Sequence, residues 1–326
     1  QSIAHGADTI VYFRWDTCLV GSEQYWHGIL PHSRISGRRF AEIKRTVEEL
    51  SPHMEAFRDG LPAAEAAILF SYDQEWALQI QPHHPDLDYV MHLQRYYDAF
   101  FRRNVPIDLI SGGGDFAKYK LLIVPLAFLT DPELCLKLYD YTAGGGHLVL
   151  DMRAGVKDWN NAVIPKTLPG SYAELLGIAI EDYDCLRQFG QGVVWQGEQE
   201  VREEANLWCD IVTVGTADVL AAYTRDYYAN TPAITRNAYG KGLAYYVGTQ
   251  PGPKIMEALV GELLARTGIE GRAPSAEPVE VTHRTGRDGD YCFVLNHGAS
   301  PETFEVPAGW EALVGGEYLA AGELRL

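Results

Sequence analysis

The stretch AHGADTIVYFRWDTCLVGSEQYWHGILPH, residues 4–32, joins an apolar run to a segment dense in aromatic and hydrogen-bonding side chains. Residues 8–14 (DTIVYFR) are apolar enough to form a buried parallel strand. The loop after it carries six such side chains, Trp15, Glu23, Tyr25, Trp26, His27 and His32. Loops that follow parallel strands hold the functional sites of (β/α)8 barrels. The stretch therefore predicts a barrel strand followed by its functional loop.

Residues 38–50 (RRFAEIKRTVEEL) continue this unit as an amphipathic helix. Its apolar residues are spaced three, four and three apart, at Phe40, Ile43, Val47 and Leu50. Ser51-Pro52 ends the helix, and Gly60-Leu61-Pro62 indicates a linker. A closed barrel needs roughly 200 residues or more, so residues 1–60 can supply only a final βα unit.

A second domain is expected over residues 61–272, where short apolar runs alternate with helical patterns. Such alternation predicts βαβ units in a doubly wound parallel sheet, similar to flavodoxin or glutamine-amidotransferase layouts. The expected strands are 66–71, 105–110, 120–126, 147–152, 211–215 and 219–223, with a hairpin over 232–248. The expected helices are 87–103, 132–142 and 254–267, the second ended by the glycines 144–146.

A third domain is expected over residues 273–326, where VEVTHRT, DYCFVLNH, TFEVP and WEALVG are separated by turn-forming residues. Short strands at this spacing predict a small all-β, sandwich-like domain.

Composition narrows the function classes. The formal charge of −17 argues against binding to nucleic acid or an anionic membrane, since both select basic patches. The five cysteines are widely spaced and form no CxxC pair, which favours reduced thiols in a cytoplasmic protein. No stretch reaches the ~18 apolar residues of a membrane-spanning helix.

Specific motifs resemble a known family. AHGADTIVYFRW, GSEQYWHGILPH and RRFAEIKRTVEEL resemble the end of the catalytic barrel of glycoside hydrolase family 42 β-galactosidases. ILFSYDQEWALQIQPHHPDLDYVMHLQRYYDAF, AITRNAYGKGLAYYVGT and FVLNHG resemble the trimerisation domain and the C-terminal β domain of that family. The likeness keeps the family's order over nearly the whole chain. It implies a homotrimer that acts on β-galactosides without a cofactor or a metal.

The resemblance also assigns roles. It implies that the acid/base and the nucleophile, two glutamates, lie on earlier barrel strands, upstream of Gln1, and that Glu23 and His27 bind sugar hydroxyls. Glu23 and His27 are four residues apart and would share a face if the segment were helical. Trp15 or Trp26 could then stack on an apolar sugar face. The alternative is a purely structural polar loop held by Arg14.

Other chemistry-bearing patterns have simpler interpretations. Asp73 and Glu75 follow a strand end and could form a catalytic pair, but they more simply cap the following helix or pair with an arginine across a subunit contact. His83 and His84 are adjacent and point in opposite directions if extended, which disfavours a metal site. Cys135 has helical spacing rather than the strand-to-helix elbow of an amidase nucleophile. The glycines 112–114 and 144–146 lack phosphate-loop spacing.

Two functions of different class remain. The chain is expected to be the C-terminal portion of a retaining β-galactosidase, binding a β-galactoside or galactose at an incomplete site. The alternative is a non-catalytic oligomerisation domain whose sugar-site loop is vestigial. An independent carbohydrate-binding module is disfavoured because Trp159, Trp195, Trp208 and Trp310 are scattered and form no platform in the sequence.

Overall fold

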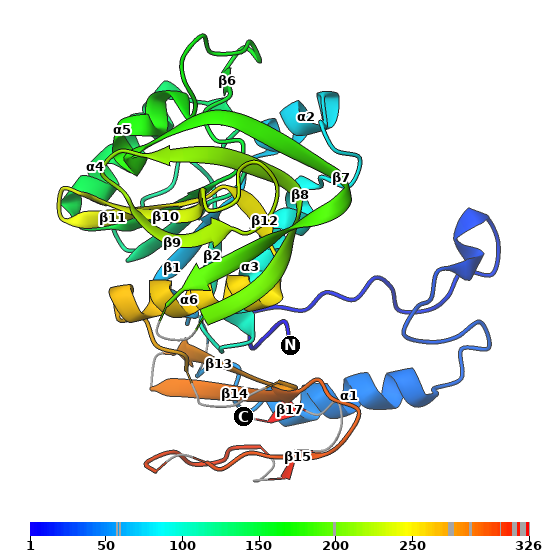
Figure 1. The fold of residues 1–326 in the computed structure, drawn as a ribbon. Coiled ribbons are helices and arrows are strands. Elements are labelled where there is room, and N and C mark those ends of the chain that lie inside the picture. The colour runs from blue at the N-terminus through cyan, green and yellow to red at the C-terminus, as the bar shows by residue number, and fades with distance from the viewer. Residues whose placement is uncertain are drawn as a thin grey trace. The chain divides into compact units, whose positions relative to one another are not determined.

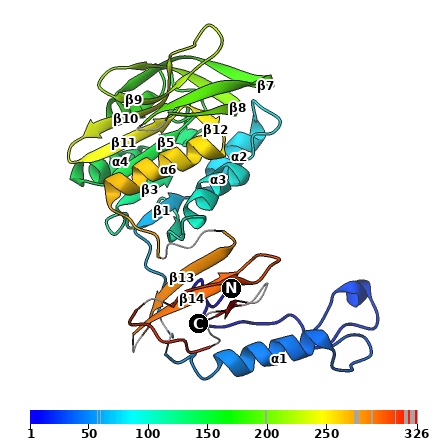
Figure 2. The same cartoon turned by 60° about the horizontal axis from the view of Figure 1, so that its bottom comes forward.

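The computed structural model describes residues 1–56, 58, 60–197, 200–272, 277–286, 289–306 and 308–314, and the backbone of 318–319 and 324–325. The chain divides into two units (Figures 1 and 2). The larger unit is Ala64–Gly271, and the smaller unit combines Gln1–Ala63 with Arg272–Leu326.

The larger unit contains a ten-stranded sheet in the order β12-β8-β7-β9-β10-β11-β5-β3-β1-β2 (Figure 1). Its strands are β1 (Ala66–Leu69), β2 (Ile107–Ile110), β3 (Leu121–Val124), β5 (His147–Asp151), β7 (Ile178–Gln196), β8 (Glu200–Val214), β9 (Asp218–Tyr223), β10 (Pro232–Tyr239), β11 (Gly242–Val247) and β12 (Thr249–Pro251). The neighbours β2-β1-β3-β5-β11 are parallel, in the flavodoxin-like order 2-1-3-4-5. The doubly wound prediction is confirmed for this half, while the other half is antiparallel.

The strands β1, β3 and β5 in the middle of the parallel half are buried on both faces, which explains why they are apolar runs. Ile68, Ile123 and Val149 point to one face, where they pack with α3 (Tyr89–Phe101) and α6 (Pro253–Thr267). The alternate residues Leu69, Leu122 and Leu148 point to the other face and pack with α4 (Pro132–Gly144) and α5 (Ala173–Leu176). The period of two along each strand therefore builds two separate cores.

The helix α2 (Tyr72–Ile80) follows β1 directly and was not expected as a separate helix. Ser71 is its N-cap, and the Ser71 hydroxyl accepts a hydrogen bond from the Gln74 N–H. Asp73 and Glu75 lie in its first turn, where carboxylates interact favourably with the positive end of the helix dipole. These two residues are therefore explained by the helix start.

The largest unpredicted element is the hairpin of β7 and β8, which curves along one side of the sheet (Figure 1). Its register shifts between Ile180 and Asp182 and between Leu186 and Gln191. Each shift reverses the face to which later side chains point, so the alternation expected of a strand is interrupted. Only residues 211–215 of this hairpin were predicted as strand.

The smaller unit contains α1 (Arg38–Leu50), β13 (Val279–Thr285) and β14 (Asp290–Asn296), where α1 and both strands match the prediction closely. The short strands β17 (Leu324–Arg325), β15 (Glu302–Thr303) and β16 (Tyr318–Leu319) add to it. Of the strand predicted over TFEVP, residues 303–307, only Thr303 belongs to a strand, β15; residues 304–306 form none, and residue 307 lies outside the described part. The strand predicted over WEALVG is wrong for residues 310–314, which form no strand; residues 315–317 lie outside the described part.

The predicted strand at residues 8–14 is also not formed: these residues have no ladder hydrogen bonds. Val11 and Phe13 are 86 % and 70 % exposed. A parallel strand exists only when neighbours pair with its backbone. The described residues of the smaller unit supply no such neighbour.

No described helix is both long and apolar enough to traverse a bilayer.

Candidate functional site

The loop after residues 8–14 is closed at its base by backbone hydrogen bonds. The Ile29 N–H donates to the Arg14 carbonyl at 2.7 Å, and the Leu30 N–H to the Trp15 carbonyl at 2.8 Å. The buried Thr17 hydroxyl donates to the Leu30 carbonyl at 2.9 Å. Gly28 lies so close that a Cβ there would be 2.5 Å from the Asp16 carbonyl carbon. Residues 14–30 therefore form a self-supporting loop, here called the closed loop.

Glu23 lies at the tip of the closed loop, in the short 3-10 helix η1 (Ser22–Tyr25). Its Oε2 accepts a hydrogen bond from Arg14 Nη1 at 2.7 Å, and its backbone carbonyl accepts one from Arg14 Nη2 at 3.1 Å. The Glu23 side chain is nevertheless 44 % exposed. The carboxylate is thus fixed in place by Arg14 and still accessible to a ligand.

His27 and Trp15 are exposed, but they do not share a helical face with Glu23. The helix η1 ends at Tyr25, and Trp26 adopts an extended backbone, so the conditional i,i+4 arrangement is not formed. Trp15 packs edge-on against Phe40 of α1, with ring centroids 6.2 Å apart. Trp26 packs edge-on against Phe13 at 6.4 Å. The loop therefore presents the Glu23 carboxylate, the His27 imidazole and the indoles of Trp15 and Trp26 as separate groups.

The adjacent histidines have structural partners. His83 Nδ1 lies 2.6 Å from Arg153 Nη1, and burial, together with the charges of Arg153 and Lys157, lowers the His83 pKa. The ring is therefore neutral and its Nδ1 accepts from Arg153. His84 Nε2 is 2.9 Å from the Leu186 carbonyl. Among the described residues, no group of three or more His, Cys, Asp or Glu side chains could hold a metal ion.

Cys135 is buried in α4, and burial raises its pKa to about 11, so it is a protonated core thiol as expected. The left-handed backbone position after β3 is occupied instead by Leu126, with φ of 46°. An amidase elbow would need a nucleophilic side chain at such a turn. The apolar Leu126 cannot supply one.

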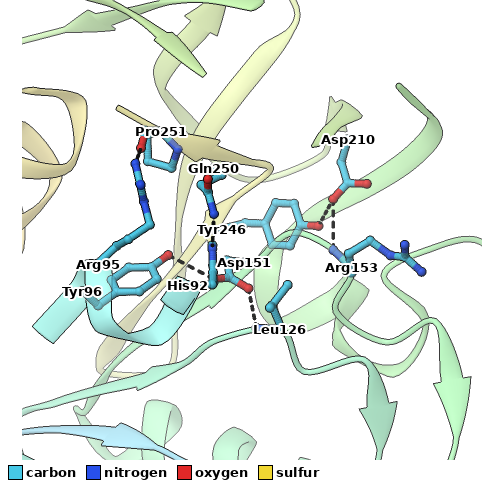
Figure 3. A network of polar contacts seen from close by, with 10 residues as sticks. All are labelled: His92, Arg95, Tyr96, Leu126, Asp151, Arg153, Asp210, Tyr246, Gln250 and Pro251. Atoms are coloured by element: carbon cyan, nitrogen blue, oxygen red, sulfur yellow. Dashed lines mark hydrogen bonds and ion pairs between the residues drawn. The ribbon is translucent and has the colours of Figure 1, made fainter. Parts of the chain in front are cut away.

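Sequence reasoning missed a buried polar network at the carboxyl ends of β3 and β5 (Figure 3). The Asp151 carboxylate accepts from the Leu126 N–H at 2.6 Å and from the Tyr96 hydroxyl at 3.2 Å. His92 Nε2 lies 2.6 Å from the same carboxylate. The side chains of His92 and Asp151 are 0 % and 1 % exposed. Asp151 thereby joins α3 to the ends of two strands.

A second buried carboxylate, Asp210 of β8, lies beside it (Figure 3). It accepts from the Tyr246 hydroxyl at 2.6 Å, the Trp208 indole N–H at 2.8 Å and the Arg153 N–H at 3.3 Å. Burial raises the Asp210 pKa against the opposing effect of these hydrogen bonds. Both carboxylates are enclosed by protein donors, so their geometry is that of anchors rather than of a ligand site. The only sequence signal was an acidic residue ending an apolar strand.

Comparisons with known proteins match three consecutive regions of the chain. Residues 1–53 match the β-galactosidase family, residues 64–270 the β-galactosidase trimerisation domain, and residues 278–326 the β-galactosidase C-terminal domain. These three matches, in this order along the chain, relate the chain to one class of glycosidases. The chain belongs to the glycoside hydrolase family 42 β-galactosidases.

The relatives extend beyond the matched region. The chain is 33 % identical to β-galactosidase BgaA of Clostridium cellulovorans, covering 94 % of this chain and 46 % of the relative. It is 32 % identical to BgaH of Haloferax lucentense, covering 97 % and 46 %. The structure of a β-galactosidase from Bacillus circulans sp. alkalophilus superposes with a TM-score of 0.93 at 29 % identity, over 99 % of this chain and 50 % of that one. The chain thus spans about half the length of these relatives and corresponds to their C-terminal portion.

Proposed function

We propose that the chain contributes the sugar-contacting loop and the assembly domain of a retaining β-galactosidase. Glu23 and His27 bind hydroxyls of the terminal galactose, and Trp15 contacts an apolar face of the sugar or its aglycone. The acid/base and nucleophilic carboxylates lie on a preceding part of the barrel. In a retaining enzyme these two carboxyl groups stand roughly 5 to 5.5 Å apart.

The observation that most supports this proposal is that the Glu23 carboxylate is hydrogen-bonded by Arg14 and is still exposed to solvent. Arg14 holds Glu23 by one hydrogen bond to the carboxylate and one to the backbone carbonyl, yet the Glu23 side chain stays 44 % exposed. The bonded oxygen is Oε2, and among the described residues no hydrogen-bond partner is found for the other carboxylate oxygen, Oε1. A carboxylate that is held by one arginine and open on its other side can accept hydrogen bonds from sugar hydroxyls.

The test joins this chain to the N-terminal half of BgaA from Clostridium cellulovorans, which supplies the part of the barrel that this chain does not match. The fusion should hydrolyse an aryl β-galactoside, whereas the 326-residue chain alone should not. In the fusion, Glu23→Gln should raise KM about tenfold or more, because a hydrogen bond to a charged group contributes roughly 1.5–3 kcal/mol.

His32→Gln is the matched control, because His32 Nε2 lies 2.7 Å from the Gln24 carbonyl at the exposed edge of the same loop. It should leave KM within about twofold. Turnover by the chain alone that disappears in Glu23→Gln would contradict the proposal, since it would place the chemistry in the loop. An unchanged KM in Glu23→Gln would favour the alternative, a non-catalytic assembly domain with a vestigial loop.

The domain limits 1–60, 61–272 and 273–326 belong to the same proposal. Residues 61–272 assemble the protein as a homotrimer, in keeping with their match to a trimerisation domain. Light scattering coupled to gel filtration should give three times the chain mass of 36.3 kDa. We also propose a cytoplasmic location, supported by five cysteines that are all unpaired.

A further inference from the structure

Among the described charged residues of the smaller unit, Arg284 on β13 is the most deeply buried, with a side chain that is 0 % exposed. Its Nη1 donates to the carbonyls of Ile3 at 2.8 Å and Ala7 at 3.1 Å. Its Nε donates to the Gly60 carbonyl at 2.9 Å, and its Nη2 to the Asp8 carboxylate at 2.6 Å. One guanidinium thereby gathers the residues before the closed loop and a residue after α1.

Neighbouring side chains of β13 hold the same N-terminal segment. The Thr282 hydroxyl donates to the Ala4 carbonyl at 3.0 Å. The buried Glu280 carboxylate is hydrogen-bonded by His5 and by His297. Below them, Ile3 and Ala4 pack with Phe293 and Leu295 of β14 in one apolar cluster. The first eight residues are therefore built into the C-terminal β domain by alternating residues of a single strand.

The segment between this attachment and the closed loop is exposed. The Asp8 carboxylate accepts from Arg284, and Arg14, six residues on, holds Glu23. Six residues span at most about 20 Å, so the position of Asp8 limits where Arg14 can reach. Within the described residues, the intervening Val11 and Phe13 are largely exposed and give the segment little further restraint.

We propose that Arg284 is a positioning residue of the galactoside site: from the C-terminal β domain it fixes the start of the segment 8–14, and through Arg14 it fixes Glu23. This rests on the proposed role of Glu23 in binding sugar. It assigns the C-terminal β domain a task in substrate affinity, in addition to packing. The fork of the guanidinium is required, because a lysine ammonium cannot reach three carbonyls and a carboxylate from one position.

The experiment uses the active fusion described above. Arg284→Lys keeps the charge and removes the fork; it should raise KM for an aryl β-galactoside about tenfold while kcat changes less than threefold. Arg284→Ala should behave similarly, and millimolar guanidinium chloride should restore part of the affinity. Thr285→Val is the matched control, because the Thr285 hydroxyl bonds only within its own hairpin, to Asp290 at 2.8 Å among the recorded contacts.

A double-mutant cycle separates positioning from general destabilisation. If Arg284 acts through Glu23, then Arg284→Lys in a Glu23→Gln background should change KM by less than twofold. Equal effects of Arg284→Lys in both backgrounds would overturn the proposal. So would a KM unchanged by Arg284→Lys in a fusion whose KM does respond to Glu23→Gln.

A third measurement tests the attachment of residues 3–8 by Arg284 separately from the proposed role of Glu23 in sugar binding. In the 326-residue chain, Arg284→Lys should accelerate amide hydrogen exchange at residues 3–8 at least tenfold while β14 stays protected. If Glu23→Gln leaves KM unchanged but this exchange accelerates, the proposed function fails and the attachment stands. If exchange at residues 3–8 does not change, the attachment itself is contradicted.

Discussion

Two apolar runs of similar composition adopt different structures: one is a buried strand, and the other is exposed and forms no strand. Leu121–Val124 forms β3, and every residue in it is buried between parallel neighbours. Residues 10–13 (IVYF) carry equally large apolar side chains, yet they form no strand and are exposed. The difference lies in the partners and not in the run itself: β3 has β1 and β5 on its two sides. An apolar run predicts where a strand can form, and the neighbouring backbones decide whether it does.

The ends of the two runs differ as well. Beyond β3, the Leu126 N–H donates to Asp151, whose carboxylate lies inside the network of Figure 3. Beyond residues 10–13, Arg14 donates to Glu23, whose carboxylate is half exposed. A buried carboxylate surrounded by donors acts as an anchor, whereas an exposed one held from one side keeps a free acceptor. The same residue class therefore serves stability in one region and, as we propose, binding in the other.

The largest effect is expected for Asp151→Ala. It would leave the Leu126 N–H, the Tyr96 hydroxyl and His92 without their acceptor inside the core. Removing one member of a buried charged network costs about 3–5 kcal/mol, so the calorimetric transition of the larger unit should fall by many degrees. Asp140→Ala on the exposed face of α4 should change it little. Equal shifts in the two variants would mean that the network does not anchor the sheet.

A pair of truncations compares the two runs directly. Ile123→Ala in β3 should lower the free energy of unfolding by about 2–5 kcal/mol, because its side chain is 0 % exposed. Val11→Ala should change it by less than about 0.5 kcal/mol, as expected for a surface site. Urea unfolding of the 326-residue chain measures both. A large loss in Val11→Ala would show that residues 8–14 are paired in solution.

A smaller effect with a defined pH dependence is expected at Glu280. Burial acts to raise its pKa, but hydrogen bonds from His5 and His297 outweigh burial and hold the pKa below its ordinary 4.5. The stabilisation is therefore present above about pH 4.5 and is lost as the pH falls through the folded-state pKa. Glu280→Gln should cost about 1–2 kcal/mol near neutral pH and much less near pH 3. A cost that is independent of pH would contradict the ionised role.

The smallest effect is expected for the buried cysteines, whose thiols should not react with a disulfide reagent. Burial raises the pKa of Cys135 and Cys292 to about 11 and of Cys209 to about 12, so these thiols are protonated at pH 8. A disulfide reagent should leave them unmodified in the native chain, while Cys18 in the closed loop should react. Intact mass spectrometry counts the modified thiols. Labelling of Cys292 would indicate that β13 and β14 separate readily.

Local sequence patterns predicted the elements in which apolar residues recur at a regular spacing. The spacing of Phe40, Ile43, Val47 and Leu50 gave α1 with its observed limits, Arg38–Leu50. Short apolar runs predicted β1, β3 and β5, because each of these strands is buried on both faces. In both cases the environment of a residue repeats regularly along the chain.

Long-range features were not predictable in this way. The β7–β8 hairpin has bulges that break the period-two alternation of its side chains, so the sequence pattern typical of a strand is lost. His92, Tyr96 and Asp151 meet only after α3 and β5 have packed, and their separation in sequence gives no signal. Of the predicted site, the sequence located the loop, but the extended backbone at Trp26 could not be foreseen. The role of Glu23, His27 and Trp15 stays a prediction.

The closed base of the loop has a consequence for protein engineering. The hydrogen bonds of Thr17 and Leu30 and the close approach at Gly28 tie the two ends together independently of what lies between residues 18 and 27. Residues 18–27 could therefore be replaced while the base of the closed loop keeps its hydrogen bonds. Loops of different length or composition could be grafted there to alter which sugars are accepted, provided that Gly28 and Thr17 are retained.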